Sequence, residues 1–431
     1  MTKTDNTSRC GPETLSIPAA ADTAPDTPAE ALADRLPARL FAPYLASAVA
    51  LAMAYGSSFL LPDALRAVGH PAATAGHVVS IGTVATLVGS LAAGRLAERT
   101  GILPLIIASA TIMAAAMACF AMIGTGGLVL AYAGGLFLGL GWAIVYVLAP
   151  VQLIHCLRPS VRLEALTLLS GSQMLGIGLS APLGRAVASH VGAPAGAYAC
   201  YAAFCAVAAA LCLAIRPRMA AQPQLPLRAV ALSGASILSI LRAPTIAPVL
   251  MIGVAACTFA GLSMFQGLYA ASRGTTPDIF FLAFTITTVV LRFSVASLLG
   301  KLPLPRLALA LFGATFLGIG LLSLNESSRI TYSVATVLFA TGYGLTYSTL
   351  NAMVVSLAAA RGLSIPVASQ VFTLGYFVGL FGFPSLAGTV IAADGIDAAL
   401  LVMMGLAGAN IAGACWVSRR DRADREPAAH R

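Results

Sequence analysis

Charged residues are scarce in this sequence. Asp, Glu, Lys and Arg together make up 10% of its 431 residues, whereas about 25% is usual in soluble proteins. Hydrophobic residues account for 58% of the chain, and the mean hydropathy is +0.89. This composition excludes a soluble domain. The sequence therefore predicts a membrane protein.

Cysteine pairs and metal-like spacings are also missing. The eight cysteines form no CxxC motif, and most of them fall in apolar stretches, where we expect them to pack as small apolar residues. His155 and Cys156 are adjacent, and adjacent residues on a helix point in different directions, so we expect no metal site. Nucleophile elbows and phosphate-binding loops are missing too. These absences argue against an enzyme, and no cofactor is expected.

Long apolar segments dominate what is present. A membrane-spanning helix needs about 20 mostly apolar residues, and continuously apolar segments indicate helices, whereas alternating ones would indicate a β-barrel. The predicted fold is therefore an all-α membrane protein with 12 transmembrane helices. The expected spans are 40–61, 73–93, 103–123, 128–149, 163–184, 197–215, 246–269, 278–299, 307–324, 330–351, 367–390 and 398–417.

Basic residues are distributed unevenly between the predicted loops. With the N-terminus in the cytoplasm, 20 of the 25 Lys and Arg residues lie on the cytoplasmic side. Arg292 lies within a span, and the four outside are Arg66, Arg185, Arg273 and Arg329. This asymmetry follows the positive-inside rule and predicts that both termini are cytoplasmic. The net charge of +9 is thus a topology signal, and no nucleic-acid partner is expected.

A short charged stretch separates the second and third predicted spans. It reads Gly94-Arg95-Leu96-Ala97-Glu98-Arg99-Thr100-Gly101. This octet resembles the loop between spans two and three of the major facilitator superfamily, which reads Gly-x-Leu-Ala-Asp-Arg-x-Gly followed by basic residues. Glu98 stands where the family has aspartate, and Ile102 and Leu103 stand where it has basic residues. The resemblance implies a conformational-switch loop made by Gly94, Arg95, Glu98, Arg99 and Gly101.

The two halves of the sequence resemble each other. Gly141-Trp142-x-x-x-Tyr146 recurs as Gly342-Tyr343-x-x-x-Tyr347, displaced by 201 residues, and Pro182 recurs as Pro384, displaced by 202. The same displacement aligns the charged octet with 296–303, where Gly300 replaces the acid. The family resemblance implies two six-helix bundles related as parallel repeats. The expected domains are a disordered cytoplasmic tail (1–39), a bundle (40–215), a linker with an amphipathic helix (216–242), a second bundle (243–418) and a basic tail (419–431).

Acidic residues are missing from the middle of every predicted span. Asp63, Glu98, Glu164 and Asp278 all lie at expected helix ends. A carboxylate inside the membrane is a common proton carrier, so the usual coupling group is missing or displaced. Asp63 and His77, near the outer ends of their spans, are the candidates for a proton-linked role. The alternative for His77 is a hydrogen-bonded residue at the outer end of its helix.

Candidate substrate-binding residues are aromatic, amide or cationic side chains within the spans. They are Tyr55, Trp142, Tyr146, Gln173, Gln266, Arg292, Tyr343 and Tyr347. The resemblance implies that several of these face the central cavity, and aromatic rings with polar tips suit an organic solute. The alternative for the aromatics and amides is helix packing or interfacial anchoring. Arg292 either reaches the inner interface or faces the cavity and binds an anionic group.

The function implied by the resemblance is secondary active transport of a small organic solute across the bacterial inner membrane by alternating access. Export coupled to proton entry is favoured, and Arg292 and the tract from Tyr343 to Tyr347 are similar to bacterial permeases of the sugar- or metabolite-efflux type. The alternatives are an uptake permease, working by proton symport or facilitated diffusion, and a non-transporting scaffold or sensor. The expected partners are the lipid bilayer and a small molecule, anionic if Arg292 faces the cavity. The chain is expected to be monomeric.

Overall fold

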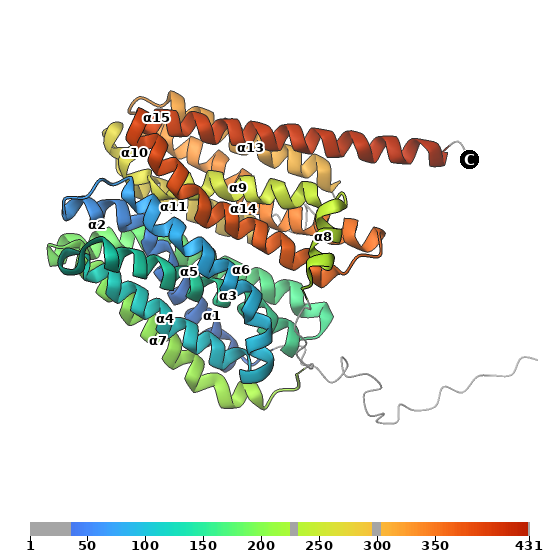
Figure 1. Cartoon of the computed structure of the whole chain (residues 1–431), viewed down its shortest axis with the longest axis horizontal. Coiled ribbons are helices and arrows are strands. Elements are labelled where there is room, and N and C mark those ends of the chain that lie inside the picture. Colours follow the sequence, from blue (N-terminus) through green and yellow to red (C-terminus); the bar gives the residue numbers. More distant parts are fainter. Residues whose placement is uncertain (1–35, 225–231, 295–302, 430–431) are drawn as a thin grey trace, which may run out of the picture.

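The computed structural model describes residues 36–224, 232–294 and 303–429, and most of them are helical (Figure 1). Three predicted features fall partly or wholly outside these ranges. They are the N-terminal tail up to residue 35, the linker at 225–231 and the second copy of the charged octet at 296–302.

The first half of the chain forms one group of helices, drawn from blue to green in Figure 1. Its members are α1 (Ala38–Gly56), the 3-10 helix η1 (Ser57–Leu60), α2 (Leu61–Ala67), α3 (Thr74–Thr100), α4 (Ile102–Ala121), α5 (Ile123–Cys156), α6 (Pro159–Val191) and α7 (Pro194–Ala220). Gly127 interrupts α5 near its start with a φ of 60°. Glycine has no Cβ atom and adopts this conformation at little cost.

The second half forms a separate group beside the first, drawn from yellow-green to red in Figure 1. Its members are α8 (Gly234–Arg242), α9 (Ile246–Met264), α10 (Gln266–Ser272), α11 (Asp278–Ser294), α13 (Leu304–Leu324), α14 (Arg329–Ala360) and α15 (Ile365–Ala429). Gly395, with a φ of 85°, divides α15 into two arms. The second arm extends past the other helices toward the C-terminus (Figure 1).

The linker contains a short helix at its end. Ser233 caps α8, because its Oγ accepts a hydrogen bond from the Ser236 backbone N–H and the Ser236 Oγ accepts one from the Ser233 N–H. This reciprocal arrangement satisfies two donors that a helix start would otherwise leave free. Ile240 is buried, while most of the helix is exposed or half-buried. The sequence predicted an amphipathic helix here.

Nine helical stretches in the described ranges are long and apolar enough to cross a membrane. One of them, 365–419, contains both arms of α15. α11, with 17 residues, and α14, which is interspersed with Thr, Ser and Tyr, are not among the nine. The chain is therefore a multi-pass membrane protein, and a count of 12 spans additionally requires α11, α14 and a separate second arm of α15.

The charged octet at 94–101 is mostly helical, so its prediction as a loop is wrong. α3 continues to Thr100, and Arg95, Glu98 and Arg99 lie exposed on its last turns. Ala97 is buried within the same turns. Leu96 and Ala97 favour a helix, and the helix ends only where Gly101 takes a φ of 87°. The connection to α4 is therefore reduced to one glycine.

Glycines allow close helix packing at equivalent places in the two halves. A Cβ atom added to Gly141 of α5 would lie 3.0 Å from the Ser109 carbonyl oxygen of α4. A Cβ atom added to Gly342 of α14 would lie 2.4 Å from the Leu311 carbonyl oxygen of α13. Small residues permit such approaches between membrane helices. The two glycines are the ones that the sequence comparison of the halves aligns with each other.

Two helix pairs join the halves: α3 packs against α15, and α6 packs against α11. We call the end of the bundle where α3 ends the Arg95 end. We call the opposite end, where α6 ends and α11 begins, the Arg185 end. Both helix pairs run between these two ends, so any movement of one half against the other must change the contacts along them.

Candidate substrate-binding site

Each half contributes a stacked aromatic pair from equivalent helices. In the first half, the ring of Tyr55 on α1 stacks on Trp142 of α5, with ring centroids 4.5 Å apart and planes inclined by 14°. In the second half, Phe259 of α9 stacks on Tyr343 of α14, with centroids 4.4 Å apart and planes inclined by 6°. Offset stacking suits the charge distribution of aromatic rings. The pairs therefore hold Trp142 and Tyr343 in similar settings.

The aromatic side chains of the two halves meet each other. Tyr146 of α5 stacks on Tyr376 of α15 with a centroid separation of 5.6 Å, and it meets Tyr347 of α14 edge-on at 6.0 Å. Tyr55 of α1 contacts Phe381 of α15 at 5.9 Å. We call the following set the aromatic cluster: Tyr55, Trp142, Tyr146, Tyr343, Tyr347, Tyr376 and Phe381. Several of its rings come from different halves and are in contact with each other.

Arg292 of α11 lies against the aromatic cluster. Its Nη2 donates a hydrogen bond to the Gly344 carbonyl oxygen at 3.3 Å. Gly344 lies halfway along α14, so the guanidinium is directed to the middle of the bundle. Gly344 directly follows Tyr343 of the aromatic cluster in the sequence. The Arg292 side chain thus points toward α14 and the aromatic cluster.

Two buried donors of this region have no acceptor in the described part of the chain. The Nε atom of Arg292 and the indole Nε1 of Trp142 are both without a hydrogen-bond partner. None of the ion pairs found among the described residues includes Arg292. Buried donors normally have partners, because losing hydration without a replacement is unfavourable. The arrangement therefore favours a ligand that supplies acceptors.

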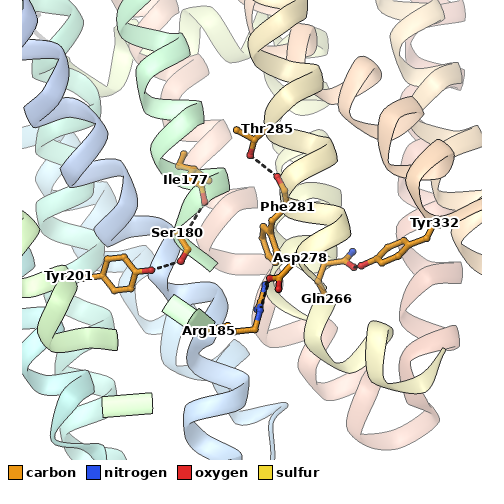
Figure 2. A network of polar contacts seen from close by, with 9 residues as sticks. All are labelled: Ile177, Ser180, Arg185, Tyr201, Gln266, Asp278, Phe281, Thr285 and Tyr332. Carbon is orange, nitrogen blue, oxygen red and sulfur yellow. Dashed lines mark hydrogen bonds and ion pairs between the residues drawn. The ribbon is translucent and has the colours of Figure 1, made fainter. Parts of the chain in front are cut away.

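The two predicted glutamines lie in different surroundings. Gln173 is buried on α6, and its amide nitrogen has no hydrogen-bond partner. Gln266 begins α10, and its Oε1 accepts a hydrogen bond from the Tyr332 hydroxyl at 2.6 Å (Figure 2). Tyr332 precedes Tyr343 by eleven residues on α14, which is about 16 Å along a helix. Gln266 therefore lies toward the Arg185 end, away from the aromatic cluster.

Most of the predicted set comes together in the structure. Six of its members, Tyr55, Trp142, Tyr146, Arg292, Tyr343 and Tyr347, lie in or against the aromatic cluster. The sequence analysis missed Tyr376 and Phe381. Tyr376 is the single tyrosine in the predicted span 367–390. A single tyrosine, with its polar hydroxyl, in an otherwise apolar span was the signal that could have pointed to Tyr376.

An ion pair joins the halves at the Arg185 end. Arg185 of α6 donates from Nε at 2.8 Å and from Nη2 at 2.5 Å to Oδ1 of Asp278, the first residue of α11 (Figure 2). Its guanidinium lies 5.4 Å from the ring centre of Phe281, a favourable cation–π contact. Phe281 in turn stacks on Phe59 of the first half, with centroids 5.6 Å apart. These contacts hold this end closed.

The α3–α15 pair closes the same end. The His77 Nδ1 lies 2.6 Å from the Ser385 Oγ, and the Ser80 Oγ accepts a hydrogen bond from the Ser385 backbone N–H at 2.9 Å. Gly76 allows this approach, since a Cβ atom there would lie 2.0 Å from the Pro384 carbonyl oxygen. His77 thus has a partner in the other half. Its proton-linked role remains a prediction.

Asp63, the other candidate for proton linkage, is paired within its own half. Its Oδ1 accepts a hydrogen bond from the Arg66 Nη2 at 2.6 Å, within α2. A Cβ atom on Gly267 of α10 would lie 3.2 Å from the Asp63 carboxylate. The carboxylate therefore also borders the second half. Asp63 and Asp278 are acids at the Arg185 end, and neither belongs to the aromatic cluster.

Toward the Arg95 end, the two halves are joined by hydrogen bonds from one glutamine side chain. The Gln370 Nε2 of α15 donates to the backbone oxygen of Ser90 at 3.1 Å and to its Oγ at 3.2 Å. Near the start of α6, a cavity of about 280 Å³ lies within the first half. It is lined by Leu36, Phe41, Leu157, Val161, Glu164, Ala165 and Leu168. This lining is almost wholly apolar and is separate from the aromatic cluster.

Metal-binding groups are not gathered anywhere in the described ranges. No three His, Cys, Asp or Glu side chains there are placed to hold a metal ion together. The aromatic cluster and Arg292 offer aromatic rings, hydroxyls and a guanidinium. These groups can bind and orient an organic solute.

Two groups of membrane helices thus meet around a buried aromatic cluster and one arginine. The family model described as Major Facilitator Superfamily matches residues 44–380, and the chain belongs to this superfamily. The resemblance found in the sequence is thereby confirmed. Among solved structures, an auto inhibited POT family peptide transporter aligns with a TM-score of 0.65 over 89% of this chain and 97% of that chain. At 14% identity this likeness shows the fold alone. No curated protein sequence matches the chain.

Proposed function

We propose that this protein moves a small organic solute across the membrane by alternating access. The two halves, 40–215 and 243–418, act as rigid parts that rock about a solute bound between them. The observation that carries this proposal is the position of the aromatic cluster, whose stacked rings of Tyr146 and Tyr376 come from different halves. A solute held there would face either end of the bundle as the halves tilt.

The contacts between the halves support a two-state mechanism. At the Arg185 end, an ion pair, a stacked Phe pair and the His77 contact join the halves. Hydrogen bonds and partly exposed ion pairs of this kind each contribute about 1 kcal/mol or less. They can therefore break without disturbing the fold of either half. The proposal includes 12 spans, arranged as two parallel repeats in a monomer.

We further propose export of an anionic solute, coupled to proton entry, at the bacterial inner membrane. Arg292 supports the anionic character, because it is a cation without a carboxylate partner in the described ranges. Acids lie at the Arg185 end rather than in the aromatic cluster. The coupling proton would therefore bind near that end, where Asp63, His77 and Asp278 are found.

A flux measurement tests the proposed function. The purified chain is reconstituted into proteoliposomes, a pH gradient is imposed, and a panel of organic acids, bases and neutral metabolites is screened. We expect saturable movement of at least one solute, driven by the gradient and abolished by a protonophore. If the solute only equilibrated across the membrane, whether or not a pH gradient was imposed, facilitated diffusion would be indicated. If folded protein gave no flux for any member of the panel, the scaffold alternative would be favoured.

The proposed topology makes a separate prediction. Arg95 and Arg99 lie at one end of the bundle and Arg185 and Arg273 at the other, so the positive-inside rule places the Arg95 end and both termini in the cytoplasm. A fluorescent reporter fused after Arg431 should be active, and an alkaline phosphatase fused there should be inactive. The opposite pair of activities would contradict the topology.

A further inference from the structure

We infer that the transported solute is a monocarboxylate with a flat apolar body, and that its carboxylate binds Arg292. This inference rests on the proposed transport function and specifies the solute. It starts from the unusual state of Arg292, whose Nε is buried without a partner and whose Nη2 makes one long hydrogen bond, to the Gly344 carbonyl oxygen at 3.3 Å. A guanidinium presents five donors in a planar fork that matches the two oxygens of a carboxylate.

The number of charges at the site sets the charge of the solute. Arg292 donates a hydrogen bond to the carbonyl oxygen of Gly344, the residue after Tyr343 of the aromatic cluster, and none of the ion pairs found among the described residues includes it. A single negative charge would neutralise it. A dianion would leave one negative charge unpaired in a region shielded from water, where an unpaired charge is costly. The site therefore favours a monoanion over a dicarboxylate.

The unpartnered donors point to the same chemistry. Besides Arg292, the buried indole N–H of Trp142 lacks an acceptor. The ring centroids of Trp142 and Tyr146 lie 5.7 Å apart, and Tyr146 meets Tyr347 of α14, the helix whose Gly344 carbonyl oxygen accepts the Arg292 hydrogen bond. Both of these unpartnered groups are hydrogen-bond donors, and an ionised carboxylate is only a hydrogen-bond acceptor. A carboxylate at Arg292 would thus bring acceptors into a region that has surplus donors.

The aromatic rings determine the rest of the solute. Tyr146 and Tyr376 stack across the boundary between the halves, with planes inclined by 21°. Tyr55 and Trp142 present a second stacked pair beside them. When the halves separate, a flat apolar body can take the place of one ring in the stack and keep the favourable geometry. A bulky or strongly hydrated body would lose these contacts.

Tryptophan fluorescence provides a binding test that does not depend on transport. The chain has two tryptophans, Trp142 in the aromatic cluster and Trp416 on the exposed surface of α15. In a Trp416→Phe protein, Trp142 becomes the sole reporter. The probes are benzoate, 4-hydroxybenzoate, cinnamate and nicotinate, each compared with its neutral amide, together with phthalate as a dianion and benzylamine as a cation.

We expect saturable quenching by at least one of the four monocarboxylates. Its amide should bind about ten- to a hundredfold more weakly, the range expected for losing hydrogen bonds to a charged group. Phthalate and benzylamine should bind more weakly than that carboxylate. Arg292→Gln should remove the difference between acid and amide, and Arg292→Lys should restore part of it, because a lysine keeps the charge but lacks the fork. Arg306→Gln, which removes an exposed arginine from α13, is the matched control and should leave binding unchanged.

Three results would overturn the inference: equal binding of acid and amide, full acid selectivity in a folded Arg292→Gln protein, or no quenching by any of the four carboxylates. Its failure can be told apart from failure of the transport proposal. Proteoliposome flux of a neutral or cationic solute that does not require Arg292 would refute the inference and leave transport intact. Carboxylate binding that depends on Arg292, without flux in proteoliposomes, would support a carboxylate site at Arg292 and refute transport.

Discussion

Gly76→Ala should open the Arg185 end of the protein. The added Cβ atom would lie 2.0 Å from the Pro384 carbonyl oxygen and 3.2 Å from the Ser385 nitrogen, so α3 and α15 must separate. Overpacking of this kind costs about 1–3 kcal/mol. Because the strained contact exists only while this end is closed, the population should shift by about 5- to 150-fold toward the open form. The folding of each half should be little affected.

Thiol labelling measures this shift. A cysteine at Thr285, a buried residue of α11 that faces Gly178 of α6, is introduced into a chain without its native cysteines. A membrane-impermeant maleimide should label it faster in Gly76→Ala than in the parent. Gly135→Ala is the matched control, because its Cβ would lie 2.0 Å from the Val78 carbonyl oxygen within the first half. That control should lower thermal stability without faster labelling, and equal behaviour of the two variants would contradict the account.

Asp278→Arg should also open the Arg185 end, and exchanging the two charges should close it again. The substitution places two guanidinium groups where Arg185 and Asp278 now form an ion pair with a 2.5 Å contact. The side chains of Arg185 and Asp278 are 22% and 40% exposed, so water screens the pair, and its loss alone is worth roughly 0.2–1 kcal/mol. Reversing one sign adds repulsion to that loss. Arg185→Asp combined with Asp278→Arg restores the attraction.

The Thr285 cysteine reports this change as well. Labelling should be fast in Asp278→Arg and return toward the parent rate in the double exchange, and high salt should reduce the difference. Arg66→Asp is the control, because it reverses one charge of an ion pair that lies within α2 of a single half. That variant should label at the parent rate. Fast labelling that persists in the double exchange would show that the charge pair does not hold this end closed.

The superfamily and the helical class could be predicted because they depend on local patterns. Apolar runs of about 20 residues predict membrane helices whatever their partners, and the octet at 94–101 carries the family pattern. The repeat of Trp142 and Tyr146 as Tyr343 and Tyr347 also singled out four residues that lie in the aromatic cluster of the structure. The same octet was misread as a loop, because a family pattern does not show whether its residues extend the preceding helix.

The contacts between the halves could not be predicted, because they join residues far apart in sequence without a shared pattern. Arg185 and Asp278 are 93 residues apart, and His77 and Ser385 are 308 apart. Nothing in the sequence distinguishes Gly76 from other small residues of membrane helices. Its role in letting α3 and α15 approach each other is visible only from its contact with Pro384. The position of Arg292 along its predicted span could be estimated from the sequence, but the direction in which its side chain points could not. The contact with Gly344 supplies that direction.

Reversible cross-linking of the two halves tests alternating access most directly. Cysteines replace Ser80 and Ser385, where the Ser80 Oγ and the Ser385 backbone nitrogen lie 2.9 Å apart, in a chain without other cysteines. A short, reducible bifunctional reagent then ties α3 to α15 at the Arg185 end. Flux of the solute identified in proteoliposomes should stop on cross-linking and return on reduction, while each single-cysteine variant stays active. Undiminished flux through fully cross-linked protein would contradict transport by rocking of the halves.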